Sequence, residues 1–238
     1  MRRGIFAWCL LGAVVLGAQE GDLDGLIEPY EVVEISSQVP GILDTVTVER
    51  GDLVEPGQIV ARLKDGLERI AVDLARLRVE FNRRQAARSE DLYASQLVSV
   101  HEEDRLETEI QLNQLQMEEA EERLKMRTIR SPIQGVVIQR FNAPGEYVGV
   151  EPIMTIAQID PLNVELIVPI ERLGSISPGM RAEVRPEEPV GGVYIGHVVI
   201  VDQVVDAASG TFGVRVELPN RDQALPAGLK CTVRLLPP

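Results

Sequence analysis

The same short pattern is written twice in this chain, 94 residues apart, with a long segment of different composition between the copies. The first copy is Gly41-Ile42, Gly51-Asp52-Leu53-Val54 and Ile59, and the second is Gly135-Val136, Gly145-Glu146-Tyr147-Val148 and Ile153. A solenoid needs about three or more adjacent repeats, so two distant copies do not predict one. The pattern instead predicts one small domain made of two similar halves, with a long insert at its middle.

Both copies lie in segments whose residue pattern, turn residues between short runs of alternating apolar residues, is typical of β structure. Pro56-Gly57 predicts a turn, because proline and glycine supply the dihedral angles that turns need. From Ile59 to Leu63 every second residue is apolar, as on one face of a strand. The same texture returns after the insert. We therefore assign the two halves of the domain to residues 30–65 and 129–160.

The insert, from Leu67 to Met126, has the composition of long helices. It contains no glycine or proline and is rich in the strong helix formers Leu, Ala, Glu, Arg and Gln. Ser99-Val100-His101-Glu102 is a capping-box pattern, so a second helix is expected to begin near Ser99. Two helices of about 28–30 residues each would measure roughly 42–45 Å. Joined by a short connection, they predict an antiparallel hairpin over residues 66–128.

Apolar residues at helical spacing mark the surfaces by which the two helices are expected to pack as a coiled coil. The stripe predicted for the first helix is Leu67, Ile70, Ala71, Leu74, Leu77 and Phe81. The stripe predicted for the second helix is Leu106, Ile110, Leu115, Met117 and Leu124. A seam this narrow provides little core, so we expect the hairpin to need a partner along its side or at its tip.

The C-terminal part predicts a small antiparallel β-barrel. Val164, Leu166 and Val168 alternate as one strand face, and Glu171 to Ile176 suggests a short helix. Three further strands are expected at 192–201, 212–218 and 229–235, with turn signals between them. Several short strands separated by turns are typical of a barrel. We assign to it residues 20–29 and 161–238.

The first residues have the features of a secretory signal peptide, assigned to residues 1–18. Met1-Arg2-Arg3 is a positive start, an apolar run of about a dozen residues follows, and small residues come next. The run is short for a membrane-spanning helix, which needs about 20 apolar residues. The segment is therefore expected to be cleaved, and an uncleaved N-terminal anchor remains the alternative. Cleavage would leave Cys231 as the single cysteine, so no internal disulfide is expected.

Charge and residue usage exclude several kinds of function. The formal net charge of −13 disfavours nucleic acid as a partner, because phosphate binding needs clustered Lys and Arg. The two histidines, His101 and His197, stand apart from any Cys or acidic cluster at metal-ligand spacing. No glycine-rich phosphate loop occurs. The sequence therefore predicts no catalytic residue, no cofactor and no metal site, and we expect a protein that is not an enzyme.

Two half-motifs split by a helical hairpin and followed by a β-barrel resemble the periplasmic adaptor proteins, also called membrane fusion proteins, of the hemolysin-secretion and resistance–nodulation–division efflux type. Pro144-Gly145-Glu146-Tyr147-Val148 and Leu225-Pro226-Ala227-Gly228-Leu229 are typical of that family. The resemblance covers roughly residues 22–238. It implies a mainly β fold in which a split biotinyl/lipoyl-like β-sandwich is interrupted by an antiparallel coiled-coil hairpin.

The resemblance also implies the function. Such adaptors link an inner-membrane transporter to an outer-membrane exit duct in a tripartite efflux or secretion pump, and they self-associate into a ring. The expected location is the periplasm of a Gram-negative-type envelope, in association with the inner membrane. Longer members carry a further membrane-proximal β domain, whereas this sequence ends at Pro237-Pro238. The contact with the transporter is therefore expected to run through the barrel alone.

The same resemblance points to three partner-docking residues at the hairpin tip: Arg88, Leu92 and Ser99. Adaptors that dock on an exit duct carry Arg, then Leu four residues later, then Ser seven residues after the Leu, and this chain has that spacing. Residues i and i+4 share one face of a helix, so Arg88 and Leu92 can meet a partner together. The alternative is structural, with Ser99 as an N-cap, Leu92 as a seam residue and Arg88 as a partner of the helix dipole.

Two other functions remain open on the sequence. A lipoyl or biotinyl carrier would present a modified lysine on a tight turn between the half-motifs, but here Lys64 is followed by the helical insert. A structural envelope assembly protein could use the hairpin without any transporter. The sequence does not exclude the envelope assembly protein, and a transporter gene encoded alongside would favour the adaptor, which is the favoured interpretation.

Overall fold

The computed structural model describes residues 21–94 and 100–236, with side chains described up to residue 88 and from residue 104. The chain divides into two compact units, which are treated separately below. One unit contains residues 163–219 and 228–238 together with the segment before Pro29, and the other contains residues 29–162 and 220–227. Two long strands, β1 (Leu23–Ser36) and β8 (Pro152–Pro169), contribute to both units.

The first unit is a closed barrel of six strands. Its order is β1-β12-β9-β10-β11-β8, and a pairing of β1 with β8 closes the ring. The strands not yet defined are β9 (Arg181–Pro186), β10 (Tyr194–Val201), β11 (Thr211–Leu218) and β12 (Lys230–Leu235). The predicted barrel is thus confirmed. Closure removes exposed strand edges, which would otherwise pair with other chains.

Alternating side chains fill the barrel. Along β11, Phe212, Val214, Val216 and Leu218 are buried while the residues between them are partly exposed. Cys231 on β12 is also buried, and this burial raises the pKa of its thiol to about 11. The thiol therefore behaves as a small apolar side chain and stays un-ionised near neutral pH.

Two details of the barrel differ from the prediction. Strand β9 was not predicted, since its buried positions are Ala182, Val184 and Pro186, and charged residues separate them. The helix predicted at 171–176 is wrong: only a single 3-10 turn, Ile170–Arg172, forms there. Gly174, with a φ of 86°, turns the chain directly afterwards, so the turn cannot continue as a helix.

The second unit contains the duplicated β domain, and its strands repeat at the spacing of the sequence motif. Strand β2 (Gly41–Val46) and β6 (Gly135–Arg140) are 94 residues apart at both ends, and so are β3 (Leu53–Val54) and β7 (Tyr147–Val148). The remaining strands are β4 (Ile59–Leu63), the start of β8, and β5 (Thr128–Arg130) after the hairpin. The repeat is therefore structural as well as sequential.

Each half pairs with the other half rather than with itself at these positions. Strand β2 pairs with β7, where Gly41 lies opposite Val148, and β3 pairs with β6, where Val54 lies opposite Gly135. The backbone hydrogen bonds repeat in the same way. Leu43 N–H donates to Glu146 C=O at 2.9 Å, and its counterpart, Val137 N–H, donates to Asp52 C=O at 2.9 Å. The two halves thus interlock about an approximate two-fold relation.

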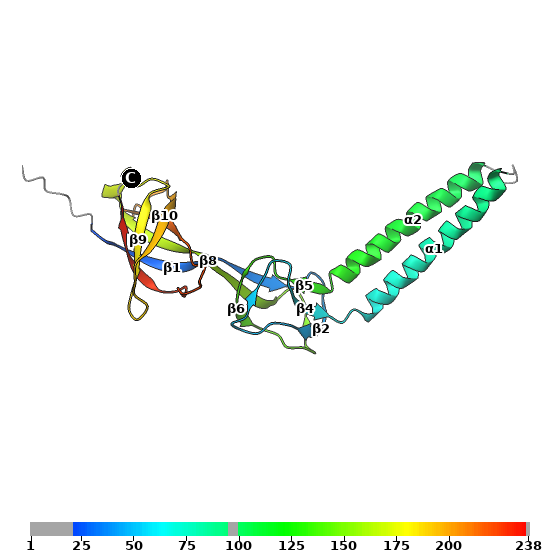
Figure 1. Cartoon of the computed structure of the whole chain (residues 1–238), viewed down its shortest axis with the longest axis horizontal. Helices are drawn as coiled ribbons and strands as arrows, with labels where there is room; N and C mark the ends of the chain where they lie inside the picture. Colours follow the sequence, from blue (N-terminus) through cyan, green and yellow to red (C-terminus); the bar gives the residue numbers. More distant parts are fainter. Residues whose placement is uncertain (1–20, 95–99, 237–238) are drawn as a thin grey trace, which may run out of the picture. The chain divides into compact units, whose positions relative to one another are not determined.

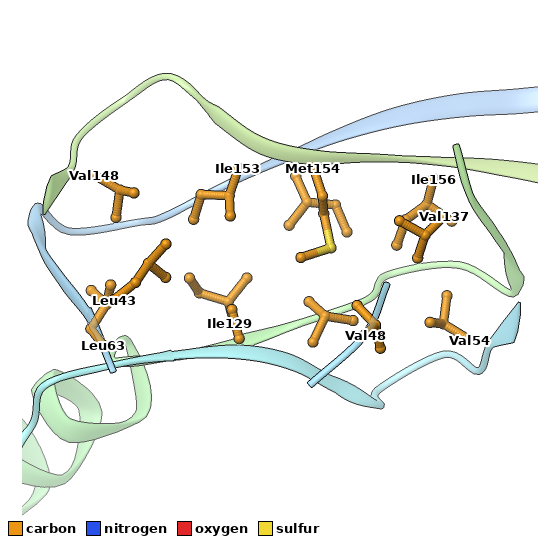
Figure 2. Packing of buried hydrophobic residues seen from close by; sticks show 13 residues of the cluster. Leu43, Val48, Val54, Leu63, Ile129, Val137, Val148, Ile153, Met154 and Ile156 are labelled. Atoms are coloured by element: carbon orange, nitrogen blue, oxygen red, sulfur yellow. The ribbon is translucent and has the colours of Figure 1, made fainter. Parts of the chain in front are cut away.

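The core of this domain draws on both halves. Figure 2 shows Leu43 and Leu63 from the first half near Val148 and Ile153 from the second, with Ile129 beside them. All five are nearly or completely shielded from solvent. Aromatic rings are absent from the cluster, whose largest members are Leu, Ile and Met. Burial of these aliphatic side chains stabilises the domain only when both halves are present.

Gly135, on β6, sits where the backbone of the neighbouring strand β8 approaches too closely for a side chain. A Cβ atom there would overlap the backbone carbonyl of Ala157 on β8. Gly149, by contrast, has no other atom within 4 Å of the corresponding position, and neither glycine has a positive φ. The two residues therefore form a matched pair for testing the close contact between β6 and β8.

We expect Gly135→Ala to lower the free energy of unfolding by about 1–3 kcal/mol, because backbone must move to admit the methyl group. Gly149→Ala should change it by no more than about 0.5 kcal/mol. Urea denaturation followed by circular dichroism measures both values. Equal stabilities for the two variants would contradict the close approach at Gly135.

The insert forms the predicted hairpin. Helix α1 spans Gly66–Ala94 and α2 spans Val100–Lys125, with 29 and 26 residues. Figure 1 shows them side by side and running in opposite directions. Helix α2 begins next to the predicted start, although Ser99 itself lies outside the described residues. The predicted fold class, a mainly β protein with a helical hairpin and a barrel, is confirmed.

Candidate functional site

The hairpin is the candidate functional site, and its base is fixed to the β domain by the chain that enters it. Lys64 follows β4 and its backbone N–H donates to Ile42 C=O at 2.9 Å, while its side chain is exposed. Asp65 precedes α1 and accepts two bonds from the Arg69 guanidinium, from Nε at 2.8 Å and from Nη2 at 2.9 Å. These hydrogen bonds hold the pKa of the Asp65 carboxyl below its usual value. The first turn of α1 is thereby held in place.

Arg127 joins the two ends of the hairpin to each other and to β2. Its Nη2 lies 2.6 Å from a carboxylate oxygen of Glu68 in the first turn of α1, and its Nη1 donates to Pro40 C=O at 3.0 Å. Both side chains of the ion pair are about four-fifths shielded from solvent. The backbone C=O of Arg127 also accepts a hydrogen bond from the Leu63 N–H at 2.9 Å. The Arg127 side chain lies where the chain returns from the hairpin to the β domain, and its contacts thus orient the base of the hairpin.

The contact between the helices does not use the stripe predicted for α1, and that prediction is wrong. Val72, Ala75 and Val79 are the buried apolar residues of α1, spaced by three and four residues as in a coiled-coil seam. The residues predicted for the seam are all exposed: Leu67, Ile70, Ala71, Leu74, Leu77 and Phe81. Small side chains let the two helices approach, and the bulkier stripe lies on a face of α1 that α2 does not cover.

The prediction for α2 is partly correct. Leu106 is buried, and Ile110, Met117 and Leu124 are partly buried, as expected for a seam. Leu115 is instead 61% exposed and lies, like Leu112, away from α1. The seam predictions for both helices failed for the same reason. Apolar residues at helical spacing identify an apolar face of a helix, but they do not show which other helix packs against that face.

Asn82 is a polar residue inside the seam. It is 94% shielded, and within the described part of the chain its amide nitrogen has no hydrogen-bond partner. An asparagine in a coiled-coil seam lowers stability but restricts the register in which the helices can pair. Asn113, on α2, is partly buried but donates from its amide nitrogen to Glu109 C=O at 2.9 Å.

Asn82→Leu should raise the free energy of unfolding of the hairpin by about 1–3 kcal/mol, since it removes a buried amide without a partner. Asn113→Leu, the matched control, removes an amide that is satisfied and should give no such gain. Thermal unfolding followed by the helical circular dichroism signal at 222 nm compares the two. A loss of stability in Asn82→Leu would contradict the seam assigned here.

The structure places only part of the predicted docking site. Arg88 lies in α1 with an exposed side chain, roughly 33 Å along the helix from its first residue. Leu92 lies one turn further in α1, but its side chain is not among those described, and Ser99 lies outside the described residues. The spatial grouping of all three thus stays a prediction. The Glu68–Arg127 pair was missed on sequence because 59 positions separate its members.

Within residues 21–94 and 100–236, no group of three or more His, Cys, Asp or Glu side chains is placed to hold a metal ion. Among the helices of that same part of the chain, none is long and apolar enough to cross a membrane.

Family comparisons agree with the fold. Residues 31–158 match the model of the CzcB-like barrel-sandwich hybrid domain, and residues 162–238 match that of the CusB-like β-barrel domain. The first match alone covers more than half of the chain. The chain therefore belongs to the membrane fusion, or periplasmic adaptor, proteins. Proteins of this family are generally not enzymes.

Individual relatives have low sequence identity to this chain, but they align with most of its length. The chain is 24% identical to the nodulation protein NolF of Rhizobium meliloti and 26% identical to the multidrug resistance protein MdtE of Escherichia coli K12, with 89% of the chain aligned to each. It spans 62% of the length of either relative. Among solved structures, a MacA–MexA chimera carrying the Pseudomonas aeruginosa MexA α-hairpin matches with a TM-score of 0.78 and 20% identity, over 90% of this chain and 80% of the other. That likeness shows the fold alone.

Proposed function

We propose that this protein is the periplasmic adaptor subunit of a tripartite efflux or secretion pump. It would link an inner-membrane transporter to an outer-membrane exit duct and would work as several copies in a ring. The observation that carries the proposal is the position of the hairpin. It starts and ends between β4 and β5, where a lipoyl carrier would have a tight turn, and Glu68 and Arg127 tie its two ends together.

Family membership supports a role in export. MdtE is a multidrug resistance protein, and a further structural match, at a TM-score of 0.73, is a putative efflux transporter of Bacteroides eggerthii. The protein would act in the periplasm, in association with the inner membrane. Its β-barrel would contact the transporter, and the energy for transport would come from that partner.

The hairpin tip would meet the exit duct through Arg88, Leu92 and Ser99. Arg88 and Leu92 are one helical turn apart near the end of α1, so both can reach one partner helix. A guanidinium beside an apolar side chain suits a small docking surface, because it combines directed hydrogen bonds with burial. A rod fixed at its base would present these residues at a defined height.

Arg88→Asp should abolish export in cells that carry the pump, since reversing the charge removes the donor and repels its acceptor. Leu92→Asp should act likewise. Arg83→Asp is the matched control, because Arg83 is exposed on the same helix but lies before the tip, and it should leave export unchanged. Export is measured as accumulation of a fluorescent substrate, and immunoblotting checks that each variant is made and secreted.

A second experiment identifies the partner without knowledge of the substrate. A photo-reactive amino acid at position 88 of the full chain, in its native host, should capture an outer-membrane duct protein, identified by mass spectrometry. The same probe at position 83 should not. Capture of other envelope proteins only, with normal export in both tip variants, would refute the docking role.

A further inference from the structure

A positively charged cavity lies at the base of the hairpin, where β4 and β5 join the ends of α1 and α2 (Figure 1). Its volume is about 390 Å³. Two carboxylates and four basic side chains line it, and the basic ones are Arg62, Arg69, Arg76 and Lys125. The whole chain has 37 acidic and 24 basic residues, so this local excess of positive charge runs against its composition.

The sheet contributes an arginine and a threonine that are available to a ligand. Arg62 on β4 lies directly opposite Thr128 on β5, and both side chains line the cavity. Side chains directly opposite each other on antiparallel strands have Cβ atoms about 5 Å apart. Among the described residues, neither the Arg62 guanidinium nor the Thr128 hydroxyl forms a hydrogen bond or an ion pair. Two neighbouring donors at the cavity are therefore unused.

Two arginines of α1 add further donors. Arg69 uses Nε and Nη2 to bind Asp65, and its Nη1 makes no hydrogen bond with the described residues. The guanidinium nitrogens of Arg76 lie 3.7 Å from a carboxylate oxygen of Asp73 and 3.9 Å from one of Glu121. Both distances are too long for hydrogen bonds. Three guanidinium groups thus have N–H donors left for a ligand.

We infer that this cavity binds a phosphate monoester, whose phosphate group lies among Arg62, Arg69 and Thr128. A phosphate has three acceptor oxygens and about two negative charges, so it satisfies more of these donors than a carboxylate can. The planar guanidinium group matches the geometry of phosphate oxygens. The cavity is within the size range of small-molecule sites, and Val72 and Leu124 give it apolar surface for the organic part of the ligand.

A bound phosphate would connect the β domain to the hairpin, because Arg62 belongs to β4 and Arg69 belongs to α1. Glu68 and Arg127 already join the two ends of the hairpin. The ligand would add a second connection and restrict the angle at which the hairpin leaves the sheet. The site does not depend on the proposed function, since its ligand is a small molecule and not a component of the pump.

A second cavity between α1 and α2 provides a matched control. Its volume is about 260 Å³, and its charged side chains are Glu68, Glu119 and Arg123. Arg123 Nη2 donates to Glu119 at 2.6 Å, so this arginine is already paired. An excess of carboxylates makes this cavity unfavourable for an anion. Loss of the Arg123 charge should therefore not affect phosphate binding.

The test measures binding of glycerol 3-phosphate to the full chain in mild detergent and phosphate-free buffer, by isothermal titration calorimetry. Binding should be saturable and should weaken as salt is added, because the contacts are ionic. Arg62→Gln and Thr128→Val should each raise the dissociation constant about tenfold or more, since each removes a donor to a charged group. Arg123→Gln should leave it unchanged. Circular dichroism shows whether each variant keeps the native fold.

A second arm identifies the source of the phosphate. Dihexanoyl phosphatidic acid carries the same glycerol phosphate with two short acyl chains. Binding about tenfold tighter than that of glycerol 3-phosphate would assign the site to a lipid headgroup, and equal binding would assign it to a free phosphorylated metabolite. In both cases Arg62→Gln should weaken binding.

Three outcomes contradict the site. One is that inorganic phosphate, glycerol 3-phosphate and dihexanoyl phosphatidic acid all fail to bind the native chain. Another is an equal loss of affinity in Arg62→Gln and Arg123→Gln, which would mean diffuse attraction to surface charge. The third is a hexaglutamate peptide that binds more tightly than every phosphate compound and is weakened by Arg62→Gln. That result would mean that the cavity receives an acidic segment of a partner protein.

Discussion

The exchange of strand partners between two halves of one small β domain is the interaction on which the rest of this unit depends. Strand β2 bonds to β7 and β3 bonds to β6, with the same backbone hydrogen bonds on either side of the two-fold relation. Neither half can satisfy these backbone groups or bury its aliphatic side chains alone. The chain must therefore return after the insert to the point where it left.

That requirement explains why a long hairpin can be inserted there. The insert needs only to bring its two ends together, and two antiparallel helices of similar length do so whatever their length. Glu68 and Arg127 then bind the ends to each other, and Arg127 also bonds to Pro40 beside β2. The interlocked halves form a stable base. Because the insert only has to bring its two ends together, the surface residues of the helices can change to suit a partner without loss of this base.

Much of this architecture could be predicted from the sequence because it rests on local signals. The repeat identified the two halves, the absence of Gly and Pro identified the helices, and turn residues identified most barrel strands. The seam of α1 was assigned wrongly because two stripes share the same spacing, and only the three-dimensional contact shows that Val72, Ala75 and Val79 face α2. Long-range polar contacts such as Glu68 with Arg127 have no local signal at all. Of the tip residues, the structure describes only the side chain of Arg88.

The most direct measurement removes the hairpin and asks whether the interlocked domain remains. A variant that lacks residues 67–126, with a short glycine-containing turn in their place, should keep the far-ultraviolet circular dichroism of β structure. It should also unfold cooperatively on heating, because the strand exchange and its core need none of the deleted residues. Loss of β structure in that variant would show that the helices hold the halves together, and would contradict the account.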